Sequence, residues 1–322
     1  MNKTLKSLCL MAAVIVGLST GASAQISLSS GLSDYKTQSG ISGKLNSIGS
    51  DTLNNLMTLW AEGFKKYYPN VTVEIEGKGS STAPPALIKG TAQLGPMSRK
   101  MKSEEIDEFE KAFGYKPRLI GVAIDGLAVY VNKDNPVKSL TLQQVDSIFS
   151  STRRRGGQPI TTWGQAGLEG EWSNRPISLY GRNSASGTYG FFKEVALKNG
   201  DYSSSVKEQP GSASVVQGVE KELGGVGYSG IGYKTSGVKV VPIADKGEAV
   251  PLTQESVTKF KYPIARFLYV YINAPPSGVE PLTKEFVRFM LSKQGQEVVV
   301  KDGYFPLTAK MEKQFLETSG CK

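Results

Sequence analysis

Apolar residues recur along the chain with two periods, one typical of helices and one typical of strands. From Leu53 to Phe64, large apolar residues fall at helical spacing until Pro69 interrupts the pattern. The stretch NVTVEIEG that follows alternates polar and apolar residues, which predicts a strand. The order of strand, polar loop and helix returns at residues 91–114 and 176–197. This pattern predicts an α/β fold built on open sheets.

Two longer, strongly apolar stretches stand apart from the rest, RLIGVAIDGLAVYVNKDNP and YPIARFLYVYIN. They bracket about 140 residues, which is a common domain size. A chain that crosses to a second lobe, builds it and returns needs such a pair of strands. We therefore expect two open mixed sheets flanked by helices and joined by a two-strand hinge. Lobe 1 would contain residues 41–125 and 265–322, and lobe 2 residues 126–264.

The N-terminus has the layout of a secretory signal peptide at residues 1–24. Lys3 and Lys6 precede an apolar run, and small residues end at Ala24. The run is too short to span a bilayer, and no later apolar stretch approaches that length. Residues 25–40, rich in Ser and Gly, predict an N-terminal arm that buries little. We expect a soluble protein that is exported to the periplasm, and the same signal peptide is compatible with secretion from the cell.

Composition excludes several kinds of chemistry. The chain has no histidine, which removes the commonest general base and metal ligand near neutral pH and rules out a Ser-His-Asp triad. Its two cysteines are Cys9, inside the leader, and Cys321, so the mature chain cannot form an intramolecular disulfide. We expect no metal site, no cofactor and no enzymatic activity.

The net charge of the chain is positive. It is +9 for the whole sequence, and removal of Lys3 and Lys6 with the leader leaves +7. Such an excess attracts anions, but it serves equally well to keep a protein soluble. No basic run interleaved with aromatic residues marks a nucleic-acid surface, so we expect no nucleic-acid partner. We interpret Arg153 to Arg155 as a solvated loop, with contact to a transporter or a ligand entrance as the alternative.

The stretch GRNSASGTYGFF combines an arginine with hydroxyl residues directly before a predicted helix. An oxyanion in a dehydrated cleft needs hydrogen-bond donors, because an unpaired buried charge is costly. Ser186 and Thr188 offer hydroxyls, Gly187 lets the backbone approach closely, and the helix start favours negative charge. Arg182 adds a planar, charged fork suited to two oxygens. Alone, the stretch is equally consistent with a capped helix and a solvated arginine.

Three further loops at strand-to-helix junctions carry hydroxyl groups. They are GSDT with Ser50, Asp51 and Thr52, GKGSST with Ser80, Ser81 and Thr82, and GPMSRK with Ser98. Each loop alone predicts only a helix cap or a turn. Because ligands of open α/β sheets bind beyond the carboxyl ends of the strands, the four loops together predict a shared anion site.

The chain resembles the periplasmic phosphate-binding proteins of phosphate-specific ABC transporters. The resemblance covers almost the whole mature chain and is carried by IGSDTLNNLMTLWAE, GKGSSTAPPAL, LGPMSRKM, AIDGLAVYVNKDNP, GRNSASGTYGFF, GSASVVQGV and VVVKDGYFPL. It implies a two-lobed, type II periplasmic-binding-protein fold that closes around one inorganic phosphate and passes it to a membrane permease. We expect the protein to be a monomer.

The resemblance also assigns residues. The R-x-x-x-S-G-T order of the family falls on Arg182, Ser186, Gly187 and Thr188, its first-loop contacts on Asp51 and Thr52, and its second-loop serine on Ser80. Some members place an aspartate in the third loop, where this chain has Ser98. A site made only of donors would accept sulfate, whereas a carboxylate demands a ligand that carries a proton. Asp51 is the leading candidate for this carboxylate, and Asp125 is the second. The alternative interpretation of Asp125 is a turn residue at the hinge, before Gly126.

Other functions stay open on the sequence alone. If no carboxylate reaches the ligand, a binding protein for sulfate or molybdate is favoured. A secreted phosphatase that uses Ser186 or Asp51 as nucleophile is disfavoured by the absence of histidine. An additional role as a surface or adhesion protein is compatible with the arm and the basic charge.

Overall fold

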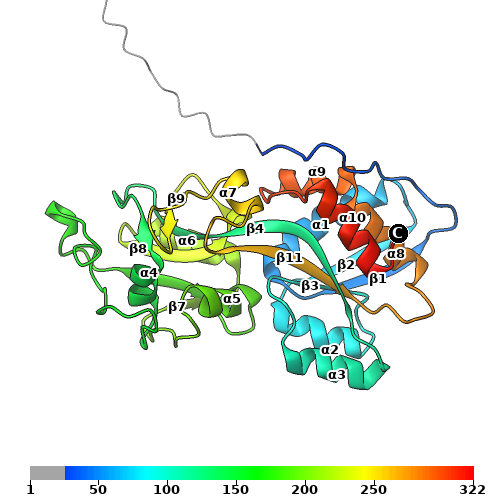
Figure 1. Cartoon of the computed structure of the whole chain (residues 1–322), viewed down its shortest axis with the longest axis horizontal. Helices are drawn as coiled ribbons and strands as arrows, with labels where there is room; N and C mark the ends of the chain where they lie inside the picture. Colours follow the sequence, from blue (N-terminus) through cyan, green and yellow to red (C-terminus); the bar gives the residue numbers. More distant parts are fainter. Residues whose placement is uncertain (1–25) are drawn as a thin grey trace, which may run out of the picture.

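The computed structural model describes residues 26–322, so the predicted signal peptide at residues 1–24 lies outside the described residues. Two groups of elements, here called lobe 1 and lobe 2, lie side by side (Figure 1). The long strands β4 (Arg118–Asn132) and β11 (Ala265–Ile272) run between them. From residue 26 onward, no helix combines the length and the hydrophobicity that a membrane crossing requires.

Lobe 1 is built from the N-terminal and C-terminal parts of the chain. Its elements are β1 (Gly43–Ile48), η1 (Asp51–Leu53), α1 (Asn54–Lys65), β2 (Val71–Glu76), η2 (Ser80–Thr82), α2 (Ala83–Ile88), β3 (Leu94–Met97), α3 (Ser103–Phe113), α8 (Pro281–Leu291), α9 (Lys293–Lys301) and α10 (Ala309–Ser319). The apolar face of α1 is buried, and Trp60 on it donates its indole N–H to the Gly295 carbonyl of α9 at 2.8 Å. The predicted helix from Leu53 to Phe64 is confirmed.

Lobe 2 is built from the middle of the chain. Its elements are β5 (Leu140–Thr141), α4 (Leu142–Phe149), η3 (Gly170–Trp172), β6 (Ser178–Arg182), α5 (Gly187–Val195), β7 (Lys207–Gln209), α6 (Ser212–Lys221), β8 (Gly225–Gly230), η4 (Ile231–Tyr233), β9 (Val238–Val240), β10 (Ile243–Ala244) and α7 (Gln254–Thr258). The strand, hydroxyl loop and helix predicted at residues 176–197 correspond to β6 and α5.

Apart from β5 and β10, which pair with each other, the strands form a mixed, curled sheet in the order β2-β1-β3-β11-β4-β8-β6-β7, with β9 also paired to β4. The first part of β4, Arg118 to Gly126, pairs antiparallel with β11, and its second part pairs with β8 and β9. Strand β4 is therefore common to the sheets of both lobes. The mixed α/β architecture with flanking helices is confirmed, whereas the exact lobe boundaries stay predictions.

Almost all of β4 is buried, which explains its continuous apolar sequence. Two polar side chains interrupt the apolar run of the paired strands. Asp125 of β4 lies directly opposite Arg266 of β11 in the antiparallel register. An acidic and a basic residue, both buried, are thus paired where β4 and β11 run between the lobes, which is the position of the predicted hinge.

Most of the N-terminal arm is exposed, as its composition predicts, but Leu32 and Tyr35 pack against lobe 1. Tyr35 packs its ring against Tyr67 and Phe289, with centroids 5.1 and 5.4 Å away. Its hydroxyl lies 2.9 Å from both the Tyr68 hydroxyl and a Glu285 carboxylate oxygen. The expectation that this arm buries little therefore holds for most of its residues, while Tyr35 supplies both an apolar surface and a hydrogen-bonding group.

The stretch Arg153 to Arg155 is only partly a solvated loop. Arg154 is exposed, but Arg155 donates from Nε and Nη2 to the carbonyls of Ala196 and Val195, at 2.7 and 2.6 Å. These carbonyls lie at the C-terminal end of α5. The solvated-loop interpretation is therefore wrong for Arg155, which stabilises the end of a helix.

Candidate functional site

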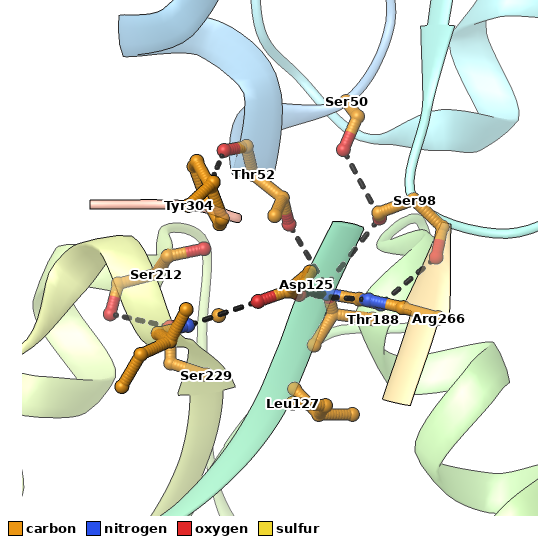
Figure 2. Close-up of polar contacts among 12 residues, drawn as sticks. Ser50, Thr52, Ser98, Asp125, Leu127, Thr188, Ser212, Ser229, Arg266 and Tyr304 are labelled. Atoms are coloured by element: carbon orange, nitrogen blue, oxygen red, sulfur yellow. Dashed lines mark hydrogen bonds and ion pairs between the residues drawn. The ribbon is translucent and has the colours of Figure 1, made fainter. Parts of the chain in front are cut away.

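The four predicted loops meet beside the hinge. They follow the carboxyl ends of β1, β2, β3 and β6, as expected for ligand sites of open α/β sheets. Five of their hydroxyl side chains are at most 2% exposed, namely Ser50, Thr52, Ser80, Ser98 and Thr188. Figure 2 shows Ser50, Thr52 and Ser98 on one side of the site and Thr188 on the other.

Hydrogen bonds join these hydroxyls across the two lobes. The Oγ–Oγ distances are 3.0 Å for Ser50–Ser98, 3.3 Å for Ser80–Ser98, 3.4 Å for Ser98–Thr188 and 2.8 Å for Thr52–Thr188. Thr188 lies in α5 of lobe 2, and the other four residues lie in lobe 1. Direct contact of the loops means that an anion held here would touch both lobes.

Gly187 lies at a close approach between the lobes. A methyl group added there would lie 2.3 Å from the Ser80 Oγ and 2.7 Å from the Ser98 Oγ. Beside this contact, the exposed Ser81 donates its hydroxyl to the Ala185 carbonyl at 3.1 Å. The predicted close backbone approach at Gly187 thus has a steric basis in the serines that face it.

Ser186 caps helix α5. Its hydroxyl oxygen accepts from the amides of Thr188 and Tyr189, at 3.1 and 3.4 Å. Because this oxygen serves as acceptor, the hydroxyl hydrogen is free to point elsewhere. The positive end of the helix dipole also faces the meeting point of the loops. The start of α5 therefore supplies donors and a partial positive charge.

Arg182 is buried beside Asp51. Its Nη1 lies 3.0 Å from Asp51 Oδ2 and donates to the Ser212 hydroxyl at 2.6 Å, while Nη2 donates to the Pro210 carbonyl at 2.9 Å. Within residues 26–322, its Nε has no hydrogen-bond partner. Burial lowers the pKa of the Arg182 guanidinium from its usual value, and the Asp51 charge acts in the opposite direction.

Ser212, at the start of α6, holds Asp51 in place. Its backbone amide and its hydroxyl donate to Asp51 Oδ2, at 2.9 and 2.8 Å. The other carboxylate oxygen, Oδ1, has no hydrogen bond among the described residues. The side chain of Asp51 is 22% exposed. Asp51 thus joins lobe 1 to lobe 2 while one of its oxygens keeps free lone pairs.

Asp125 is more completely engaged. Its Oδ2 accepts from Arg266 Nε at 2.9 Å and lies 2.8 Å from Arg266 Nη2, while Oδ1 accepts from the Ile231 amide at 3.0 Å. The side chains of Asp125 and Arg266 are 0% and 2% exposed. Asp125 also lies near Thr52, since a methyl group added at Gly230 would lie 3.3 Å from Asp125 Oδ2 and from Thr52 Cγ2. Figure 2 shows Asp125 and Arg266 beside Thr188.

The structure thus brings the predicted residues to one place, with Ser81 at the rim and Asp125 at the hinge. Two further residues, Arg266 and Ser212, were missed in the sequence. The sequence did hold a signal for Arg266, since it is the lone arginine in IARFLYVYI and AIDGLA contains a lone aspartate. An antiparallel pairing of the two long strands would have placed these two residues opposite each other. Ser212 lies in the stretch GSASVVQGV, but no charge or spacing in the sequence connected it with Asp51.

The two arginines and two aspartates leave the inner site with balanced charge, so neutral donors and helix α5 would have to provide most of its affinity for an anion. Next to it lies a groove of about 790 Å³ between the lobes. Its charged walls are Arg99, Lys100, Lys102 and Glu105 from lobe 1, Lys193 and Glu194 from lobe 2, and Arg266 of β11. No group of His, Cys, Asp and Glu suited to a metal ion occurs within residues 26–322.

The architecture and the site define a class of protein. The profile of the PBP superfamily domain matches residues 35–294. Among solved structures, a Clostridium perfringens protein, assigned as a phosphate ABC transporter substrate-binding protein and solved with bound phosphate, superposes with a TM-score of 0.69. It is 27% identical and covers 83% of this chain and 100% of its own. The fold is therefore that of a type II periplasmic binding protein.

Sequence relatives narrow this class. The phosphate-binding protein PstS of Pseudomonas aeruginosa is 55% identical over 303 residues, which cover 93% of this chain and 94% of that protein. An ABC-type phosphate transport receptor from Vibrio cholerae, with a TM-score of 0.64 and 24% identity over 82% of this chain and 100% of its own, shares the fold. The chain belongs to the PstS family of phosphate-binding proteins within the PBP superfamily. This is a family of transport proteins and not of enzymes.

Proposed function

We propose that this protein captures inorganic phosphate between its lobes and delivers it to the membrane permease of an ABC transporter. The observation that carries the proposal is the convergence of buried hydroxyls from both lobes with Arg182 and the start of α5. Such a set of donors suits a tetrahedral oxyanion. The 55% identity to a protein named for phosphate binding selects phosphate among the oxyanions.

The donors fall into three kinds. The first is hydroxyl groups, from Ser50, Thr52, Ser80, Ser98, Ser186 and Thr188. The second is backbone amides at the start of α5, where Gly187 permits close contact. The third is the Arg182 guanidinium, whose unpartnered Nε is a buried donor in need of an acceptor. Ser81, exposed at the rim, would contact the ligand least.

A carboxylate acceptor would give the site its preference for phosphate over sulfate. Near neutral pH phosphate carries a proton and sulfate does not, so an acceptor-only group attracts the first and repels the second. Asp51 suits this role because its Oδ1 has free lone pairs and the side chain is partly exposed. Asp125 is less suited, since Arg266 and the Ile231 amide engage both of its oxygens.

The capture would proceed by hinge closure. Strands β4 and β11 cross between the lobes, and we place the hinge where residues 125 and 126 face 265 and 266. Lobe 1 would then contain residues 41–125 and 265–322, and lobe 2 residues 126–264. Ligand contacts to both lobes stabilise the closed form. The protein would act as a monomer outside the cytoplasmic membrane, after removal of residues 1–24, and would do no covalent chemistry.

Equilibrium binding tests this function. Purified mature protein, stripped of bound anions, is incubated with radiolabelled phosphate, and unlabelled phosphate, sulfate or molybdate is added as competitor. We expect displacement by phosphate alone. Displacement by sulfate at similar concentrations would reject the proposal in favour of another oxyanion. Release of phosphate from a phosphomonoester would reveal the phosphatase alternative instead.

A further inference from the structure

Arg266 contacts both lobes and the hinge with a single side chain. It lies on β11, and its Nε and Nη2 hold Asp125 of β4. Its Nη1 donates to the Ser98 carbonyl of lobe 1 at 2.8 Å, and its Nη2 donates to the Thr188 hydroxyl of lobe 2 at 3.0 Å. Figure 2 shows these contacts radiating from Arg266. A change in the angle between the lobes must therefore disturb this group.

The contact to Thr188 fixes a direction of hydrogen bonding. A guanidinium has five donors and no acceptor, so the Thr188 oxygen must accept from Arg266. The single hydrogen of that hydroxyl is then available only as a donor to a third group. The Thr52 and Ser98 hydroxyl oxygens lie 2.8 and 3.4 Å away, and both belong to the loops that form the site, so a hydrogen that Thr188 donates to either of them points toward these loops. An acceptor such as a phosphate oxygen benefits from a donor oriented in advance.

Arg266 does not serve as a free positive charge for the ligand. The Asp125 carboxylate balances it at 2.8 Å, and both side chains are almost fully buried. A buried pair of this kind contributes little net stability, although loss of one partner leaves an uncompensated charge. The role that remains for Arg266 is geometric.

Resting on the function proposed above, we propose that Arg266 is a positioning residue for the bound phosphate. It orients the Thr188 hydroxyl as a donor into the site and fastens the Ser98 loop to the same point. Asp125 holds the guanidinium in the required orientation. The pair thereby connects lobe closure at the hinge with retention of the ligand.

A double-mutant cycle tests this connection with the full mature protein and inorganic phosphate as probe. Thr188→Val removes the hydroxyl while keeping the shape of the side chain. Asp125→Leu with Arg266→Met replaces the buried pair by apolar residues, which often preserves stability. The dissociation constant and the dissociation rate are measured for the wild type, for Thr188→Val, for the paired replacement and for all three changes together.

We expect Thr188→Val and the paired replacement each to raise the dissociation constant about tenfold or more, mainly through faster dissociation. Their effects should overlap, so that Thr188→Val costs less than about threefold once Arg266 and Asp125 are replaced. Full additivity would overturn the proposal, as would wild-type affinity in the paired replacement. Failure of the wild type to bind phosphate would instead reject the proposed function and would say nothing against the network itself.

A second variant covers misfolding of the paired replacement. Arg266→Lys keeps a positive charge beside Asp125, but a single ammonium group lacks the fork that reaches both Ser98 and Thr188. It should show the same faster dissociation and the same overlap with Thr188→Val, and wild-type kinetics would overturn the proposal. Arg288→Met, which removes a partly buried, ion-paired arginine of α8, is the matched control for a merely structural role. It should change the melting temperature at most and leave phosphate dissociation unchanged.

Discussion

Arg182 and Arg266 are both buried, and each is paired with an aspartate. Arg182 lies 3.0 Å from Asp51, and Arg266 lies 2.8 Å from Asp125. Because these charges cancel, an anion entering the site meets no net positive charge in its inner shell. Hydroxyls, backbone amides and the dipole of α5 must therefore supply most of its stabilisation.

The fit at Gly187 gives the first prediction. Gly187→Ala places a methyl group within 2.3 Å of the Ser80 Oγ, so the two lobes cannot approach as closely. We expect phosphate affinity to fall between about tenfold and about a hundredfold, from overpacking of this contact. Titration calorimetry with phosphate measures the loss.

Gly190→Ala is the matched control, since it lies in the same helix. Its added methyl group would meet only the flexible side chain of Arg99, at 3.4 Å. Alanine also favours the helical conformation over glycine. If both substitutions weaken binding equally, a steric role for Gly187 is contradicted.

Asp302 provides a prediction about pH. It is half-buried beside Asn55, and burial raises the pKa of its carboxyl to about 6. The folded protein therefore binds this proton more tightly than the unfolded chain, whose usual value is 3.8. Stability on this account is highest at low pH and is lost as the pH rises from about 4 to about 6.

Asp302→Asn removes that dependence. We expect the variant to have the higher free energy of unfolding above pH 6, with the difference vanishing below about pH 4. Urea unfolding at a series of pH values measures it. Equal stability of the two proteins above pH 6 would show that the Asp302 carboxylate is adequately solvated in the folded state.

At the residue scale, the sequence predicted which hydroxyl residues lie together, but it did not predict the buried ion pair of Arg266 and Asp125. Ser98 and Thr188 stood out because they follow strands and precede helices or turns. Arg266 did not, because it sits inside an apolar strand where its partner lies 141 positions away. Pairing of that kind depends on strand register, which a single sequence does not contain.

At the element scale, helix α5 is supported at both ends. Ser186 caps its start, and Arg155 donates to two carbonyls at its end. The charge of Arg155 is also favourable at a helix C-terminus. Helix α5, which carries Gly187 and Thr188, is thus stabilised by Arg155 from a loop that the sequence predicted to be solvated.

Arg155→Ala should lower the free energy of unfolding by about 1–3 kcal/mol, through loss of these charged hydrogen bonds. Urea unfolding measures the change, and the exposed neighbour Arg154→Ala serves as the control. We expect the control to stay within about 0.5 kcal/mol of the wild type. Equal effects of the two substitutions would contradict the helix-capping role.

The elements themselves were largely predictable. Helical spacing from Leu53 to Phe64 and the two long apolar stretches each correspond to an element. The attachment of the N-terminal arm was not, because it depends on a few residues, among them Leu32 and Tyr35. Local composition averages over such single anchors, whereas tertiary packing does not.

At the scale of the whole molecule, positive charge gathers where the lobes meet. Lys100 and Lys102 line the groove beside the site, are exposed and form no ion pair among the described residues. Charge lining a cleft raises the local concentration of anions and their rate of arrival. Because charge is balanced in the inner site and lysines line the groove, we assign retention of the anion to the inner residues and its arrival to the groove lysines.

Lys100→Glu combined with Lys102→Glu should slow phosphate association about tenfold at low salt and leave dissociation nearly unchanged. Stopped-flow kinetics at several salt concentrations would show the difference shrinking as salt rises. Lys310→Glu with Lys313→Glu makes the same change in net charge on the exposed side of α10. An equal slowing in that control would mean that net charge, and not the groove, sets the rate.

The two-lobed plan followed from the two long strands, but the identity of the ligand did not follow from charge or composition. A positive total of +9 is compatible with any anion. What distinguishes phosphate is a proton, and the group proposed to detect it is one carboxylate among several. Its free oxygen became visible only with the contacts of Asp51 to Ser212 and Arg182.

The most direct test of the account is therefore a calorimetric titration of wild type and Asp51→Asn, each with phosphate and then with sulfate. The account predicts tight phosphate binding and no sulfate binding by the wild type, with Asp51→Asn accepting both anions. Unchanged selectivity in Asp51→Asn would contradict the role of Asp51 and transfer it to Asp125. Sulfate binding by the wild type would contradict phosphate capture itself.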